Sequence, residues 1–182
     1  MMAAVLDSIA ARTGRSLAAW VDLVAASGID PLEQNAVRRW LREAHGLGQN
    51  TQWAIAEECA RRAGWLRPTV EEYAAAQYLG RRAAFRPVFD AVRDAALALG
   101  PDVRMEGRST YIPFVRARQF AAVAVTTSRV DLGLRLPAPP PSPRLVPANA
   151  PGQSTHRVTL YQARDVDASV RTLLRAAYDQ NG

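Results

Sequence analysis

Apolar residues in the first third of the chain recur three and four positions apart, and this spacing predicts helices. Three are expected, over residues 16–28, 31–45 and 50–63. The second has the clearest start, because Asp30 is an N-cap acceptor and Pro31 suits the first turn of a helix. The third is expected to bury Trp53, Ile55 or Ala56, and Cys59. We therefore expect residues 1–66 to form a small helical module.

A glycine-containing turn, with Gly46 and Gly48, separates the second and third predicted helices, as in a DNA-binding helix-turn-helix. In that interpretation Gln49, Asn50, Thr51 and Gln52 begin a recognition helix and face base edges. The alternative is a three-helix bundle whose turn only joins antiparallel neighbours. Residues 1–70 hold eight arginines and seven acidic residues, so this module is a weak phosphate binder. The charge therefore favours the plain bundle, with His45 as a helix cap and Cys59 in the core.

From residue 103 onward the apolar residues alternate with polar ones, which predicts strands. The predicted strands cover residues 103–106, 110–115, 119–126, 130–136 and 155–161. Two helices precede them: one opens at a capping box formed by Thr69 and Glu72, and the other begins near Arg86 or Pro87. A last helix is expected to be capped by Asp165. A proline-rich loop at 137–151 lies before the fifth strand.

These patterns predict an α+β protein in which a small three-helix module precedes a two-layer domain of antiparallel sheet packed on helices. The α+β domain is expected to cover residues 69–182, with the boundary near Pro68. Strand alternation places Val130, Leu132 and Leu134 on the face toward the helices. It places Asp131 on the opposite face, whereas His156 falls on the apolar side.

The positive charge of the chain is concentrated in the strand-rich region. The formal net charge is +6, and between Arg104 and Arg157 eight arginines stand against only Glu106 and Asp131. This surface is either a solvated face with cross-strand ion pairs or a platform for an anionic partner, with nucleic acid the leading candidate. The candidate contact residues are Arg104, Arg108, Arg116, Arg118, Arg129, Arg135 and Arg157.

The sequence lacks the residues that most classes of enzyme require. The chain has no lysine, which excludes a Schiff-base or P-loop lysine. Its two histidines and single cysteine lack the spacing of metal ligands, and no nucleophile elbow is present. The sequence thus indicates neither metal nor cofactor and favours a non-catalytic binding or regulatory protein. One alternative is a small-molecule-binding protein or enzyme with a pocket near Tyr111, Asp131 and His156. Another is a protein-interaction adaptor that presents the proline-rich loop.

The chain gives no sign of membrane insertion or secretion. No apolar run approaches the roughly 18 residues of a spanning helix. The N-terminus lacks a basic start followed by an apolar run, and a lone cysteine cannot form an internal disulfide. We therefore expect a cytoplasmic protein that does not bind membranes.

Several short segments carry a resemblance to known families. In the first third they are Trp40 followed by residues 45–48 (HGLG), and in the remainder residues 129–134 (RVDLGL) and 155–158 (THRV). On these segments the chain resembles a bacterial tandem of two families of domains of unknown function. The second domain is also broadly similar to frataxin-like and double-wing folds. The resemblance implies no established activity.

Overall fold

The computed structural model describes residues 9–182, which divide between Arg67 and Pro68 into two compact units. Each unit buries its own cluster of apolar side chains. Near the division Leu66 is 85% exposed, so this apolar side chain belongs to neither core. Within residues 9–182 no helix is long and apolar enough to cross a membrane.

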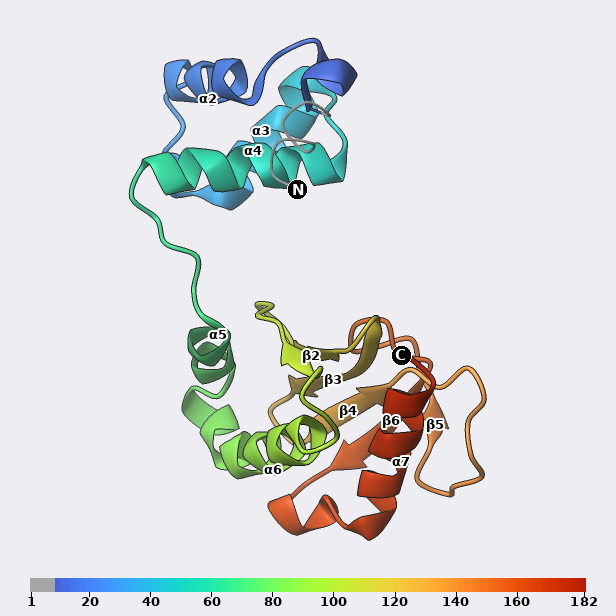
Figure 1. The fold of residues 1–182 in the computed structure, drawn as a ribbon. Helices are drawn as coiled ribbons and strands as arrows, with labels where there is room; N and C mark the ends of the chain where they lie inside the picture. Colours follow the sequence, from blue (N-terminus) through green and yellow to red (C-terminus); the bar gives the residue numbers. More distant parts are fainter. Residues whose placement is uncertain (1–8) are drawn as a thin grey trace. The chain divides into compact units, whose positions relative to one another are not determined.

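The first unit contains the helices α2 (Leu17–Ala26), α3 (Gln34–His45) and α4 (Gln49–Arg62) (Figure 1). Ser16 caps α2 by accepting a hydrogen bond from the Ala19 amide. The apolar positions at helical spacing meet in one core that includes Trp20, Leu41 and Ile55. His45 ends α3 and lies edge-on to the rings of Trp20 and Trp40, at centroid distances of 5.1 and 4.6 Å.

Two expectations for this unit were wrong. The helix α3 begins at Gln34 rather than at Pro31, and Asp30 is not its N-cap, because the Asp30 carboxylate accepts a hydrogen bond from the Leu32 amide and closes a separate turn. Trp53 is 47% exposed, although Ile55, Ala56 and Cys59 are buried as expected. The Arg38 guanidinium stacks over the Trp53 ring at 3.6 Å, which lets the ring stay at the surface.

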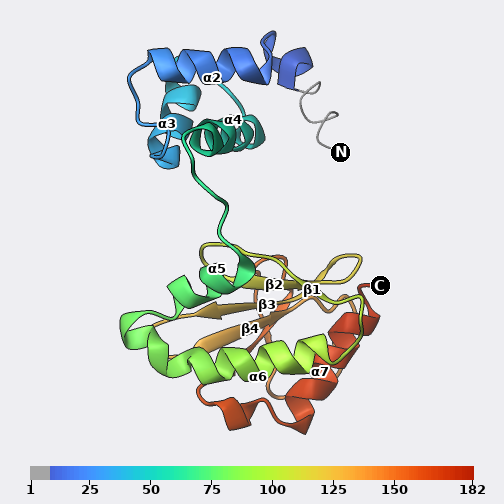
Figure 2. The ribbon, with the colours of Figure 1, turned by 60° about the vertical axis from the view of Figure 1, so that its left-hand side comes forward.

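The second unit places helices on one face of a six-stranded antiparallel sheet (Figures 1 and 2). It begins with α5 (Val70–Gln77), the 3-10 helix η1 (Gly80–Phe85) and α6 (Arg86–Leu97). The strands, in the spatial order β1-β2-β3-β4-β6-β5, are β1 (Arg104–Met105), β2 (Ile112–Val115), β3 (Gln119–Val125), β4 (Val130–Leu134), β6 (His156–Leu160) and β5 (Val146–Pro147). After the 3-10 helix η2 (Ala163–Asp165), α7 (Ala168–Asp179) returns to the same face as α6. The predicted α+β class is confirmed.

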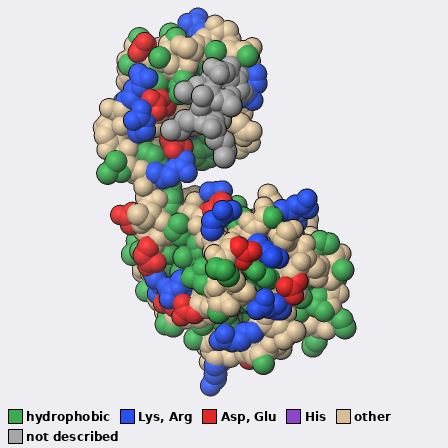
Figure 3. All heavy atoms as spheres, in the orientation of Figure 1, with side chains coloured by type: hydrophobic (Ala, Val, Ile, Leu, Met, Phe, Trp, Pro, Cys, Tyr) green, Lys and Arg blue, Asp and Glu red, His purple; other side chains and the backbone are tan. Residues whose placement is uncertain are grey.

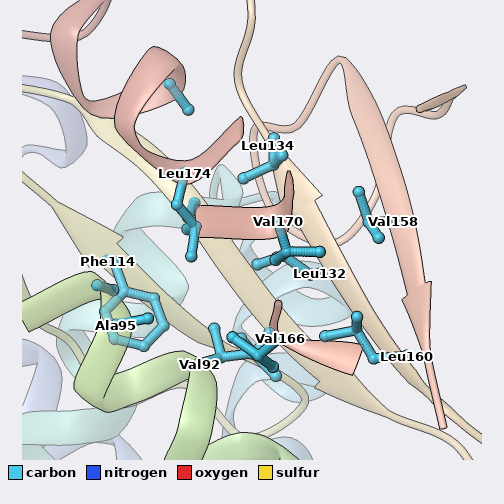
Figure 4. Close-up of a cluster of buried hydrophobic side chains, with 14 of the residues drawn as sticks. Val92, Ala95, Phe114, Leu132, Leu134, Val158, Leu160, Val166, Val170 and Leu174 are labelled. Atoms are coloured by element: carbon cyan, nitrogen blue, oxygen red, sulfur yellow. The ribbon is translucent and has the colours of Figure 1, made fainter. Parts of the chain in front are cut away.

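The core of the second unit lies between the sheet and α6 and α7 (Figure 4). Register aligns Val123, Leu132 and Val158 across three neighbouring strands, so these side chains share one face. Val92 of α6 and Val170 and Leu174 of α7 cover them, and all are at most 1% exposed. Each fully buried side chain of this kind contributes roughly 1.5–3 kcal/mol, which fixes the sheet against the helices.

The last third of the chain differs from expectation at two places. Asp165 caps η2 rather than the final helix, because its carboxylate accepts the amides of Tyr161 and Gln162. Asp167 caps α7 through the Val170 amide at 3.0 Å. The expected proline-rich loop contains the short strand β5, which pairs with β6. Proline is tolerated there because β5 is an edge strand.

Candidate functional site

The face of the sheet opposite the helices is partly covered by the end of the proline-rich loop. Gly133 lies in the middle of this face and has no side chain, which lets Pro151 and Ser154 pack directly on β4. A Cβ at Gly133 would overlap Ser154 Oγ and come within 2.7 Å of Pro151 Cδ. Ser154 Oγ donates to the Pro151 carbonyl at 2.5 Å and so holds the loop closed on itself. The sequence did not predict this cover.

Beside this loop lies a cavity of about 350 Å³, hereafter the sheet cavity. Residues of β2 and β3 line it, together with Gln153, which follows the proline-rich loop. The polar side chains that line it are Glu106, Arg108, Tyr111, Arg118, Gln119 and Gln153. The apolar part of the lining includes Pro113 and Val115, so the cavity combines an apolar surface with several hydrogen-bonding groups.

Gln119 is the most unusual residue of the sheet cavity. It is only 8% exposed, and its Nε2 has no hydrogen-bond partner among the described residues. The amide packs against Gly152, where a Cβ would come within 2.6 Å of it. A buried amide without a partner costs about 1–3 kcal/mol, so a group that bonded to it would recover this energy.

Four of the candidate arginines border two hollows that both include Ala117, in the turn that joins β2 to β3, and we call Arg104, Arg108, Arg116 and Arg118 the turn arginines. Arg108 and Arg118 line the sheet cavity, whereas Arg104 and Arg116 line a second hollow of about 410 Å³. The two hollows share Ala117 and therefore adjoin.

Two of the turn arginines are paired with carboxylates. Arg108 lies 2.7 Å from Glu106, and Arg116 lies 2.6 Å from Asp102 and 4.2 Å from the Tyr178 ring centroid. The hydrogen bond from Arg116 holds the pKa of Asp102 below its ordinary value. Arg104 donates to the Arg116 carbonyl at 3.4 Å, and Arg118 is exposed.

The other three candidate arginines are used within the protein. Asp131 is 8% exposed and lies between Arg129 at 2.9 Å and Arg157 at 3.7 Å. Arg135 donates to Gln153 Oε1 at 3.2 Å and thus supports the loop wall of the sheet cavity. Of the seven candidates, only the turn arginines border the two hollows.

The alternative pocket of Tyr111, Asp131 and His156 is not formed. Tyr111 lines the sheet cavity, whereas Asp131 faces its neighbours Arg129 and Arg157. His156 is paired with Leu134 on the helix-facing side, and its Nδ1 lies 2.9 Å from Thr155 Oγ1. Asp131 and His156 therefore lie on opposite faces of the sheet, as strand alternation requires.

The proline-rich loop is attached to the second unit at both ends. Arg144 donates to the Asp167 carboxylate at 2.9 Å and to the Asp165 carbonyl at 3.0 Å. The strand β5 pairs with β6, and Ala138 exchanges two hydrogen bonds with Gln180. These contacts reduce the availability of the loop as an extended ligand for another protein.

In the first unit, the start of α4 is partly buried. Thr51 and Gln52 are 7% and 9% exposed, and the Gln52 amide donates to the Leu47 carbonyl. Half of the residues expected to face base edges therefore support the turn instead, while Gln49 and Asn50 are exposed. Cys59 is buried, and burial raises the pKa of its thiol to about 11, which makes it a poor nucleophile. In residues 9–182 no group of three His, Cys, Asp or Glu side chains could hold a metal ion.

Sequence reasoning missed Gln119, Gln153 and the loop cover over Gly133. One signal was present: Gln119 is a polar residue at the head of an otherwise apolar strand, QFAAVAV. The contribution of Gln153 depends on how the loop folds back, and no local pattern in the sequence indicates that.

The fold and its two hollows define an α+β protein with an arginine-bordered cavity on the sheet face away from its helices. Residues 74–181 match the family described as Domain of unknown function (DUF5655), and residues 1–67 match Domain of unknown function (DUF4287). Because the first match covers more than half of the chain, the chain belongs to the DUF5655 family. The predicted tandem of two such families is confirmed. No curated protein and no solved structure matches the chain.

Proposed function

We propose that the second unit binds nucleic acid through the turn arginines. The observation that carries the proposal is their convergence: guanidinium groups from residues 104–108 and 116–118 border two hollows that adjoin at Ala117. Four guanidinium groups lie there beside two ion-paired carboxylates, those of Asp102 and Glu106, and the Asp179 carboxylate also acts on Arg116. A surface with this surplus attracts an anion.

A polyanion suits this arrangement better than a single small anion does. The positive charges are distributed over two neighbouring hollows rather than focused on one point, which fits the repeated phosphates of a strand. Arginine can contact each phosphate through two parallel hydrogen bonds. Residues 68–182 hold 15 arginines and 10 acidic residues, so the whole unit also has a positive surplus. On the face seen in Figure 3, basic and acidic side chains are interspersed over this unit and form no patch of one sign.

The proposal includes a cytoplasmic location. A chain with one cysteine, buried and reduced, needs no oxidising compartment for its stability.

Fluorescence anisotropy with a labelled oligonucleotide, repeated at several salt concentrations, tests this function. We expect the logarithm of the association constant to fall linearly with the logarithm of salt concentration. Arg118→Ala should weaken binding roughly three- to tenfold and make the salt slope shallower by about 0.7 for a single strand. Arg118 is the best position because it is exposed and its side chain forms no ion pair among the described residues.

Arg171→Ala is the matched control, since Arg171 is an exposed arginine on α7 and does not border either hollow. It should leave affinity nearly unchanged. Binding that ignores salt, or equal losses in the two variants, would show that the turn arginines are not the contact surface.

A further inference from the structure

We infer that the sheet cavity takes one unpaired base of a bound strand, so that the protein prefers single-stranded to duplex nucleic acid. The inference rests on the proposed function, because the turn arginines would hold the strand while the cavity holds the base. The volume of the cavity is the first argument. At about 350 Å³ the cavity is near the lower end of the range of roughly 300–1,000 Å³ for ligand sites, which suits a single ring system.

The chemistry of the walls is the second argument. Tyr111 offers an aromatic surface, with Pro113 and Val115 beside it. Unstacked bases pack on aromatic side chains whatever their sequence, because every base has a π-face. In a duplex both faces of a base are already stacked, so only an unpaired base can use this surface.

Gln119 provides the third argument, because it needs a partner that the protein does not supply. Gln119 as a whole is 8% exposed, and its Nε2 is buried and unpaired among the described residues. A carboxamide presents a donor and an acceptor side by side, and this pair matches the donor and acceptor on the edge of a base. Gln153 brings a second carboxamide to the same cavity.

The charges bear on the choice between a nucleotide and a small free anion as occupant. Glu106 lines the same cavity, where its carboxylate offsets the charge of Arg108 and leaves the exposed Arg118 as the remaining positive group to attract an oxyanion placed inside. The same carboxylate would accept a hydrogen bond from an N–H group of a base. Arg108, which pairs with Glu106, and the exposed Arg118 can instead contact the phosphates on either side of that base. A neutral base inside the sheet cavity, with its phosphates outside beside the arginines, agrees with this arrangement of charges.

The experiment compares three labelled probes in anisotropy titrations with the full chain: a single-stranded DNA, a strand of equal length built from abasic sites, and a duplex of the same sequence. The abasic strand keeps every phosphate but has no base to insert. We expect the base-bearing single strand to bind at least tenfold more tightly than either of the others. Gln119→Leu and Tyr111→Ala should each reduce that advantage to about twofold while leaving the abasic strand's affinity unchanged.

Tyr161→Ala is the matched control, because Tyr161 is 62% exposed and does not line the cavity. Thermal melts accompany every variant. Gln119→Leu should melt no lower than the parent protein, because the substitution removes an unpaired amide. If Gln119→Leu does not fold, Tyr111→Ala still tests the inference. Equal binding of base-bearing and abasic strands, with normal salt dependence, would overturn this inference and leave the proposed function standing. Binding of none of the probes would remove both.

Discussion

Two neighbouring residues of α4 show how local surroundings set the charge of a side chain. Hydrogen bonds from Arg61, and then Arg62, lower the pKa of Glu58 to about 2 against the opposing effect of burial. At the next position burial raises the pKa of the Cys59 thiol to about 11. The carboxylate reaches two guanidinium groups at 2.8 and 2.9 Å, whereas the thiol faces the core. The two pKa values shift in opposite directions because Glu58 has charged partners whereas Cys59 is removed from solvent, and not because of their positions along the helix.

The Cys59 thiol should be almost unreactive in the folded protein. With a pKa of about 11, roughly one thiol in a thousand is ionised near pH 8, and the thiolate is the reactive form. A disulfide reagent that releases a coloured thiol measures the rate. We expect labelling to be slow in buffer and complete within the mixing time in strong denaturant. Equally fast labelling in both conditions would mean that Cys59 is not buried in solution.

Glu58 should make the stability of the first unit depend on pH in the acid range. A pKa lowered from 4.5 to about 2 stabilises the fold fully above pH 4.5, and this contribution is lost as pH falls through 2. Because both arginines are largely exposed, screening reduces the gain to about 1 kcal/mol. Glu58→Gln should therefore lower the free energy of unfolding by that amount at pH 7, and the difference should disappear only below pH 2. Denaturant titrations followed by tryptophan fluorescence provide the measurement.

At the scale of elements, sequence pattern predicted most of the fold because burial repeats with the period of the structure. Alternation placed Val130, Leu132 and Leu134 on one face of β4, and all three are fully buried. The start of α3 was misplaced because Asp30 forms a turn of its own, and a side-chain pattern cannot show which of two adjacent turns continues as a helix. The candidate site was only partly predicted. The turn arginines were among those named, but Gln119 and the loop cover depend on contacts between distant segments.

The packing of the loop on β4 can be tested by adding a single methyl group at Gly133. Gly133→Ala should displace Pro151 and Ser154, because the added Cβ overlaps Ser154 Oγ. We expect a loss of about 1–3 kcal/mol in the free energy of unfolding of the second unit. The displaced loop carries Gln153, so oligonucleotide affinity should fall as well.

Gly48→Ala is the control for that change, since a Cβ at Gly48 meets no atom within 4 Å and its φ is −69°. It should leave both the second unit's stability and the affinity close to those of the parent. An unchanged melting temperature for Gly133→Ala would mean that the loop does not rest on β4.

At the scale of the whole molecule, the two cores carry different natural probes. All four tryptophans lie in residues 1–67, and all five tyrosines lie in residues 68–182. Selective excitation of tryptophan therefore reports on the first unit alone. Circular dichroism of the strands reports on the second, because every strand between residues 9 and 182 belongs to it.

We predict that a core substitution in one unit leaves the unfolding of the other unchanged. Leu132→Ala removes a fully buried side chain from the second core and should cost about 2–5 kcal/mol there, without moving the tryptophan transition. Leu41→Ala, also fully buried, should have the converse effect. Denaturant titrations recorded by both signals make the comparison. A shift of both transitions by either substitution would show that the two units unfold as one.

The residues around Leu66 also determine how the chain can be cut. Leu66 is 85% exposed, so chymotrypsin can reach the bond that follows it. The next residue, Arg67, precedes Pro68, and trypsin does not cleave a bond whose leaving nitrogen belongs to proline. Brief digestion should thus release two resistant fragments with chymotrypsin, while trypsin leaves this junction joined.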